Sequence, residues 1–581
     1  MKLIKNKWLL IVVAWWTWLP LVAGLFYLWA THGPFAPNGY GWVYELALGV
    51  KAGFLMSNAS AGYYILVGAL GTIGIALFAV YQPSSWDNNY NGKLKPNRHT
   101  WITLAVAGVL AITSVVSLVM IVGWENGKDF GKYYANSTVF YVKDVHDVPD
   151  SLKNLATDAR FDVDGCDLLG VADVRGCVKQ GELPSAGWDG RISSLEGATL
   201  AIRRKTDGVQ RVSLDEQTVT YLNARGNQSA MWSGVLDGSG KEQSLYGVAE
   251  WAGSKDPKVC QFEGQYAIKR AFSGERGNSL GNYIHEKYPN YRWNMSDVWG
   301  YCDGDQPIVV IPLTQPMKWL GRSVDTAAGV LVVQGDNGNE PKLTYKPEVK
   351  QGEFPGPVYP DSLVAVQREE AKWAAGRKNM DRYSFGYDPS NSEVQSGNPA
   401  EYLLRDKTTG RLVFVTPLTL RSSSSEVFVA YSVTYADEVQ AGSLNELSIY
   451  VLGHNDPRLV NIDQLSAEAN DWMAKNAGMF RANQGKLIEF TPIDGDVWRV
   501  FGELGGQVVY QLDISASRKI APVLVSVGAY GDSPTPSQQP GSTAGQSVCG
   551  DNIAALDNSA LAECLRVVTG EIQSRLQTAG K

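Results

Sequence analysis

The pentapeptide GNSLG, residues 277–281, has the spacing of a nucleophile elbow, the strand-to-helix turn that presents a serine to an acyl carbon. Ser279 would be the nucleophile, and Asp437 and His454 follow it in the chain order of the α/β-hydrolase triad. Such an elbow requires a buried strand just before the serine, whereas residues 268–278 are rich in charge and glycine. We therefore predict no catalytic residue and keep an envelope serine hydrolase as an alternative function.

Other reactive side chains lack the neighbours that catalysis or metal binding needs. The serine run 422–425 follows an apolar strand and has no histidine near it in sequence, which is typical of a polar turn. Beyond residue 124 the histidines are His146, His285 and His454, and none has metal-ligand spacing to another. The sequence therefore predicts no metal site and no cofactor.

Aromatic residues give the clearest indication of a binding surface. Residues 282–301, NYIHEKYPNYRWNMSDVWGY, hold six Tyr and Trp in twenty positions. Tyrosine and tryptophan present large rigid surfaces and are enriched where proteins hold partners. We expect the binding residues to come from this segment: Tyr283, Tyr288, Tyr291, Trp293 and Trp299.

All six cysteines lie beyond residue 124, and no two of them form a CxxC pair. An even number in an exported chain is typical of disulfides, whereas zinc ribbons and thioredoxin-type sites use CxxC. Several connectivities are open, and pairing between sequence neighbours closes the shortest loops. We expect the bridges Cys166–Cys177, Cys260–Cys302 and Cys549–Cys564.

Three runs near the N-terminus, residues 8–30, 61–81 and 101–124, contain no charged residue. Each is long enough to cross a bilayer as a helix, and the first is too long for a signal peptide. The flanking lysines and arginine place the N-terminus in the cytoplasm and residues 125–581 on the extracytoplasmic side. The sequence thus predicts a multi-pass protein of the cell membrane, with lipid as one partner. Residues 42–56 are too short and too charged to span, which favours an interfacial or re-entrant segment.

Charge and small residues indicate further partners. The chain carries a net charge of −7; seven Lys/Arg and two acids give residues 1–124 a charge of +5, which leaves −12 for the rest. An acidic body argues against nucleic acid, because phosphate binding uses clustered cations. Gly68, Gly71 and Gly74 allow close helix packing, either within this chain or between copies in an oligomer. The remaining partners expected are proteins of the envelope or of a membrane complex.

A short sequence pattern, here called the phrase, recurs in the second half of the chain. QPIVVIPLTQ at residues 306–315 is matched by RLVFVTPLTL at 411–420, with Gly304 two residues before the first and Gly410 directly before the second. KLIEFTP after Gly485 has the same form. We expect strands that end at their prolines, because proline cannot donate to a central ladder. The phrase is therefore interpreted as a building block and not as a nucleophile-bearing loop.

Two helices recur with the phrase. Residues 361–376 and 463–478 each begin with aspartate, end with glycine and carry a tryptophan, Trp373 or Trp472, on the apolar face. Earlier in the chain, residues 137–145 and 198–206 have the apolar and β-branched content of strands.

These patterns predict a membrane-anchored α+β protein with three N-terminal transmembrane helices and a large ectodomain of repeated β-rich and α modules. Its non-catalytic function would be binding or scaffolding in the cell envelope. The alternatives are the Ser279 hydrolase and an accessory subunit of a transport or secretion complex. The expected regions are a membrane anchor (1–124), a first α+β region (125–303), two repeat modules (304–409 and 410–484), a partial third repeat (485–530), a Pro/Ser/Gly linker (531–548) and a disulfide-stapled helical tail (549–581).

Overall fold

The structure is a computed structural model that describes most of residues 128–144, 178–375, 386–389 and 402–527, and a few positions before residue 113. Within these ranges it leaves out 190, 192, 207–208, 210–211, 226–228, 239–243, 254–255, 275, 320–321, 338–339, 422–426, 454, 478–479, 481, 505–506 and 520. The early positions are 11, 14–16, 18, 68, 71–73, 105, 108–109 and 112.

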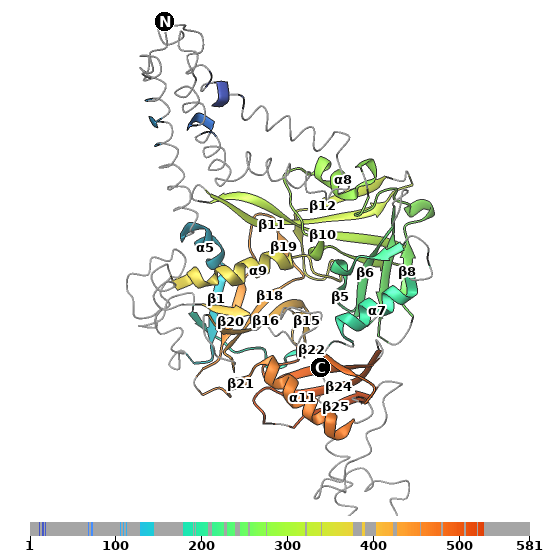
Figure 1. The fold of residues 1–581 in the computed structure, drawn as a ribbon, viewed down its shortest axis with the longest axis vertical. Coiled ribbons are helices and arrows are strands. Elements are labelled where there is room, and N and C mark those ends of the chain that lie inside the picture. The colour runs from blue at the N-terminus through green and yellow to red at the C-terminus, as the bar shows by residue number, and fades with distance from the viewer. Residues whose placement is uncertain are drawn as a thin grey trace, which may run out of the picture.

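The described part of the chain is mostly β-sheet, and each of its four larger sheets follows a helix in sequence (Figure 1). Helix α7 (Leu195–Thr206) precedes a five-stranded sheet in the order β4-β6-β7-β8, with β5 also paired to β6. Its strands are β4 (Val212–Leu214), β5 (Thr220–Leu222), β6 (Met231–Gly238), β7 (Leu245–Trp251) and β8 (Lys258–Gln261).

Helix α8 (Leu280–Lys287) precedes the second sheet, an antiparallel meander in the order β12-β11-β10-β9. Its strands are β9 (Trp299–Asp303), β10 (Gln306–Trp319), β11 (Arg322–Gly335) and β12 (Pro341–Lys346). Helix α11 (Ile462–Asn476) precedes the last meander, in the order β22-β23-β24-β25. Its strands are β22 (Lys486–Pro492), β23 (Val497–Leu504), β24 (Gln507–Ser515) and β25 (Val523–Val527).

The largest sheet lies between these two meanders in Figure 1 and has the order β2-β1-β20-β18-β16-β15-β3, with β14 paired to β16. Helix α9 (Asp361–Glu370) precedes most of it, and β1 joins it parallel to β20. Its strands are β1 (Thr138–Val142), β2 (Val178–Gln180), β3 (Trp188–Asp189), β14 (Tyr387–Pro389), β15 (Tyr402–Asp406), β16 (Leu412–Leu420), β18 (Ala430–Tyr435) and β20 (Leu447–Val451).

Short elements complete the described fold. Two-residue strands pair as β13 (Glu348–Val349) with β19 (Val439–Gln440), and as β17 (Val427–Phe428) with β21 (Leu459–Val460). The remaining helix is α5 (Lys128–Ala135), and the 3-10 turns are η2 (Glu216–Thr218), η3 (Gly264–Tyr266), η4 (Arg276–Asn278), η5 (Met295–Asp297) and η6 (Ala371–Ala375).

The prediction of a membrane-anchored α+β protein is wrong. Among the described residues no helix is long and apolar enough to cross a membrane, and sheet dominates over helix. The predicted spans 8–30, 61–81 and 101–124 and the segment 42–56 fall almost wholly outside the described positions. The predicted multi-pass membrane localisation, with residues 125–581 on the extracytoplasmic side, is therefore not supported.

The predicted spans rested on apolar content alone. Apolar content does not separate a membrane-spanning helix from a segment that packs against its own chain, because both use the same side chains. Where described, the first two runs contact each other: the indole of Trp16 donates to the Thr72 hydroxyl at 2.9 Å. A side chain at Gly68 or Gly71 would collide with Trp16 or Trp15. Rings of the same chain therefore occupy the space beside these two glycines. Gly74 lies outside the described residues.

The repeated phrase has a common structural setting in two of its three copies. β10 and β16 are each the second strand of a hairpin, and the turn before each contains a glycine with positive φ, Gly304 at 62° and Gly410 at 71°. A residue with a Cβ is strained in that conformation. The third copy, β22, instead begins its meander.

The strands do not end at the first two prolines, which corrects the prediction. β10 continues past Pro312 to Trp319, and β16 continues past Pro417 to Leu420. Pro312 lies beyond the last residue that β9 pairs, and Pro417 lies where the partner of β16 changes from β15 to β14. A proline is tolerated there because the ladder needs no donor on that side. Only β22 ends at its proline, Pro492.

Both recurring helices form, with starts displaced from the predicted caps. In α9, Asp361 is already helical, and in α11 the cap is Asn461, which accepts from the Gln464 amide at 3.0 Å. Trp373 is buried, Trp472 is half-buried, and the glycines that would end the helices lie outside the described residues.

Residues 198–206, predicted as a strand, form most of helix α7. The side chain of Ser194 accepts from the Gly197 amide at 2.9 Å, which satisfies one of the free donors of the first turn. Glu196 lies in the first turn and three cations lie in the last, so charges at both ends complement the helix dipole. The strand at 137–145 is confirmed as β1.

Candidate functional site

Ser279, the predicted nucleophile of the hydrolase alternative, is the N-cap of α8. Its side chain is 0 % exposed and its hydroxyl accepts from the Asn282 amide at 3.2 Å. Asp437, the triad acid, instead binds Arg411 at 2.7 Å, and His454 lies outside the described residues. The geometry thus gives the serine and the aspartate structural partners.

The other chemical candidates offer no site in the described part of the chain. The serine run 422–425, His146 and four of the six cysteines lie outside it. Within it, no group of three His, Cys, Asp or Glu side chains could hold a metal ion. The bridge Cys260–Cys302 is confirmed, and it joins β8 to β9 across two sheets.

The aromatic segment lies on α8 and on the loop after it, at the outer side of the β9–β12 sheet (Figure 1). Tyr283 projects from α8, and its ring lies 4.3 Å from the guanidinium of Arg270 and 5.6 Å from the ammonium of Lys287. Arg270 is itself held by Glu340, at 2.7 Å. A half-exposed tyrosine therefore lies close to two cations.

The next two tyrosines form a cluster with a residue of β12. The Tyr288 ring lies 6.2 Å from that of Tyr291 and 6.1 Å from that of Tyr345, and Tyr291 stacks on Tyr345 at 4.9 Å. All three are half-buried against the core below. Burial, and a hydrogen bond with Tyr291, raise the pKa of the Tyr345 hydroxyl above its usual range. Tyr345 is thus uncharged, and all three rings pack on the core with part of each exposed.

The two tryptophans differ. Trp293 is half-buried and lies 5.8 Å from the Phe272 ring, at the margin of the same cluster. Trp299 is 0 % exposed and its indole donates to the Pro357 carbonyl at 2.6 Å, so it belongs to the core and not to the surface. Tyr283, Tyr288, Tyr291, Trp293 and Tyr345 are hereafter the tyrosine surface.

The tyrosine surface is held in place from below and from the side. The Arg292 backbone exchanges hydrogen bonds with Thr314 of β10, at 2.8 and 2.9 Å, and its side chain binds Asp325 at 3.1 Å. The disulfide Cys260–Cys302 belongs to the core cluster that supports these rings. Such rings need little further ordering on binding.

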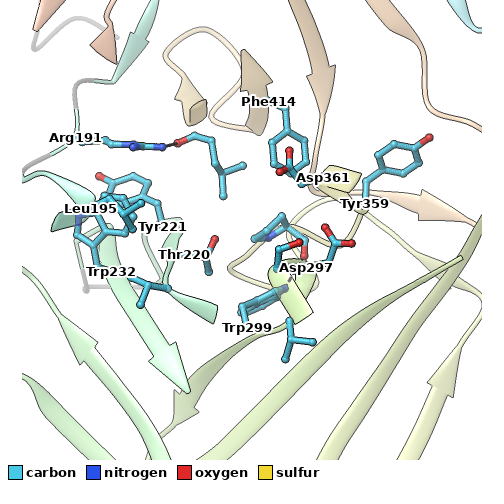
Figure 2. Close-up of a pocket in the computed structure, with 15 residues that line it drawn as sticks. Arg191, Leu195, Thr220, Tyr221, Trp232, Asp297, Trp299, Tyr359, Asp361 and Phe414 are labelled. Atoms are coloured by element: carbon cyan, nitrogen blue, oxygen red, sulfur yellow. Dashed lines mark hydrogen bonds between the residues drawn. The ribbon is translucent and has the colours of Figure 1, made fainter. Parts of the chain in front are cut away.

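A cavity of about 120 Å³ lies where the β4–β8 sheet, β9, the start of α9 and the large sheet meet (Figure 2). Rings form much of its wall, and they are Tyr221, Trp232, Trp299, Tyr359 and Phe414. Arg191 lies at one side with Tyr221 and Trp232, and the carboxylates of Asp297 and Asp361 lie at the other. Sequence analysis did not identify this site, because its residues come from distant segments with no motif.

Arg191 is fixed by three contacts. Its guanidinium forms an ion pair with the buried Glu489, donates to the Leu403 carbonyl at 3.1 Å and lies 4.9 Å from the Trp232 ring centre. Glu489 also accepts from the Leu195 amide at the start of α7, and its backbone has a φ of 49° at a bulge in β22. The positive charge on the wall is therefore already matched by a carboxylate outside the cavity.

Asp297 and Asp361 come together through α9. The Ser362 hydroxyl donates to Asp297 at 2.6 Å, and the Ser362 amide donates to the same carboxylate at 3.2 Å. Asp361 precedes Ser362 in the first turn, where a negative charge is favoured by the helix dipole. Asp297 is buried, so two acids share the cavity wall with aromatic rings.

Comparisons with protein-family models, with curated proteins and with solved structures found no match to this chain.

Proposed function

We propose that this protein is a non-catalytic binding protein, and that the tyrosine surface is where it holds a protein partner. The observation that carries the proposal is the cluster of Tyr288, Tyr291 and Tyr345, which packs on the core and leaves part of each ring exposed. Aromatic side chains and arginine dominate the energetics of protein interfaces, and Arg270 lies beside Tyr283.

The position of Tyr345 adds a second mode of contact. Tyr345 belongs to β12, which is the terminal strand of its sheet among the described residues. A terminal strand offers backbone donors and acceptors to an extended segment of another chain. We infer a partner segment that pairs with β12 and packs an apolar side chain on the tyrosine rings.

Site-specific photo-crosslinking tests the proposal. A photoreactive phenylalanine analogue at Tyr291 of the full chain, produced in its native cells, should crosslink one defined protein at the same mass in repeated preparations. The matched control is Tyr450, which is half-buried and stacks on Tyr141 at 5.0 Å on another sheet.

The two positions separate a binding surface from ordinary stacking. The proposal requires a crosslinked product at Tyr291 and none of that mass at Tyr450. Equal products at both positions, or none at Tyr291, would refute it.

A further inference from the structure

Strand β12 has a charge pattern that the proposed function does not use. It reads PKLTYK over residues 341–346, with two lysines and no acid. The chain beyond residue 124 carries a net charge of −12, so this strand is a basic element on an acidic body. A segment that pairs with β12 must place its own side chains beside these cations.

The side chains of β12 alternate between the two faces of its sheet. Leu343 and Tyr345 pack against the core cluster below the tyrosine surface. Lys342 and Lys346 therefore lie on the opposite face, where the Lys346 ammonium is 5.7 Å from the Phe354 ring. A strand added to this edge would have the same two faces, one on the tyrosine rings and one beside the lysines.

The backbone of β12 is open on the side away from β11. Residues 341–346 pair with β11 along their whole length, and in the described part of the chain their backbone forms no hydrogen bond with any other segment. In an antiparallel pair, alternate residues turn their N–H and C=O groups away from the partner strand. These groups can pair with an extended segment of another chain.

Lys342 is the cation that this edge leaves without an acid. Its side chain is exposed, and no acid that the structure describes lies within ion-pair distance of it. The acids nearby are engaged elsewhere, because Glu340 binds Arg270 at 2.7 Å and Glu353 pairs with Lys346. The edge therefore has one unmatched positive charge and a second cation that is already shared with an acid.

Lysines on a terminal strand also select against a wrong partner. A second copy of β12 would bring its own two lysines to the same edge, and like charges directly opposite each other are destabilising. A strand with acids at alternate positions would gain from the same geometry, because opposite charges across a strand pair attract. The charge of β12 thus favours an acidic segment over a second copy of this chain.

We propose that the partner segment is an acidic β-strand, with apolar side chains at alternate positions on the tyrosine rings and carboxylates at the positions between them, beside Lys342. This inference rests on the proposed function, since it names the chemistry of the segment that the tyrosine surface holds. It goes further by specifying the charge and the alternating pattern of that segment.

Two synthetic peptides of equal length test the charge directly. One alternates valine with glutamate and the other alternates valine with lysine, so both present the same apolar face. Fluorescence anisotropy of each labelled peptide, titrated with the full chain, measures its affinity. The net charge of the whole chain is −7 and would favour the lysine peptide, so a preference for glutamate requires a local basic site.

The proposal predicts saturable binding of the glutamate peptide, at least about fivefold tighter than that of the lysine peptide, because the contact with Lys342 changes from attraction to repulsion. Equal affinities, or no binding of the glutamate peptide, would overturn it.

Lys342→Glu reverses the charge of the edge and leaves the tyrosine rings in place. It should reverse the preference, so that the lysine peptide binds more tightly than the glutamate peptide. Lys486→Glu is the matched control, because Lys486 is also exposed and begins β22, a terminal strand of another sheet. Circular dichroism checks that both variants fold. An unchanged preference in a folded Lys342→Glu variant would contradict the proposal.

The outcomes are distinct from those of the proposed function. A crosslink at Tyr291 with no preference between the peptides would leave the tyrosine surface as a binding site and remove the acidic strand. Self-association of the wild-type chain that Lys342→Glu alters, measured by sedimentation velocity, would assign the edge to a second copy and would also overturn the proposal.

Discussion

At the scale of single residues, Ser279 shows that the same short sequence can match a catalytic motif and yet form a helix cap. Its hydroxyl accepts from the Asn282 amide, and the side chain is fully buried. Ser279→Ala should therefore lower the free energy of unfolding by about 1 kcal/mol, the usual cost of a lost cap. Denaturant unfolding measures that loss. A fluorophosphonate probe should not label the wild-type serine, and labelling that His454→Ala abolishes would restore the hydrolase.

Asp237 gives a prediction about pH. Its carboxylate is 4 % exposed, and burial raises its pKa to about 6, although the Ser273 amide donates to it at 2.7 Å. The folded state therefore holds a proton more tightly than the unfolded chain, whose aspartate has a pKa of about 3.9. The contribution of Asp237 to the free energy of unfolding should therefore fall as pH rises from about 3 to about 7, by about 3 kcal/mol in total.

Asp237→Asn isolates this contribution because it removes the titration and keeps the size of the side chain. Denaturant unfolding at several pH values between these limits should show a smaller decrease for the variant than for the wild type. The same slope in both proteins would show that Asp237 does not titrate in this range.

At the scale of elements, the disulfide Cys260–Cys302 joins β8 and β9 and thereby two sheets. The bridge closes a sequence separation of 42 residues, and cross-links of such loops stabilise proteins by about 2–4 kcal/mol. Replacing both cysteines by alanine should lower the free energy of unfolding by about that amount, measured in denaturant without reductant. An unchanged midpoint in the double variant would show that neighbouring packing alone fixes β8 to β9.

Local patterns predicted elements where the deciding chemistry was local. The strand β1, the positions of α9 and α11 and the pair Cys260–Cys302 followed from apolar content, helix ends and short loops. Helix α7 was predicted as a strand from apolar and β-branched content, whereas the hydrogen bond that marks its start joins the Gly197 amide to the Ser194 hydroxyl, outside the predicted segment. The strands β10 and β16 were predicted to end at their prolines, but they continue past them. Whether a strand can contain proline depends on whether a neighbouring strand needs the backbone N–H at that position, and strand pairing cannot be read from the local sequence.

The candidate site likewise contains residues that the sequence predicts and residues that only the fold brings together. The half-exposed tyrosines lie in one segment and could be predicted from its composition, but their fourth ring, Tyr345, comes from β12. Trp299 shares that segment and is buried, because it begins β9. The cavity joins Arg191, Asp297 and Phe414, whose proximity depends on how the sheets pack, and no spacing in the sequence encodes it.

At the scale of the whole molecule, a buried ion pair joins two segments that are far apart in sequence. Arg191 and Glu489 are 298 residues apart and connect the entry to α7 with the last meander. The large sheet extends this organisation, because β1 from the start of the described body pairs with β20. The tyrosine surface therefore belongs to a body in which an ion pair and strand pairing connect segments that are distant in sequence.

The central claim, that the tyrosine surface binds a protein partner, is tested most directly by affinity. The partner identified at Tyr291 would be purified and titrated against the full chain, Tyr291→Ala and the matched control Tyr450→Ala, with circular dichroism as a check on folding. We predict that Tyr291→Ala weakens binding by at least about 2 kcal/mol, as interface hot spots do, while Tyr450→Ala leaves the affinity unchanged. Equal affinities for a folded Tyr291→Ala variant and the wild type would contradict the account.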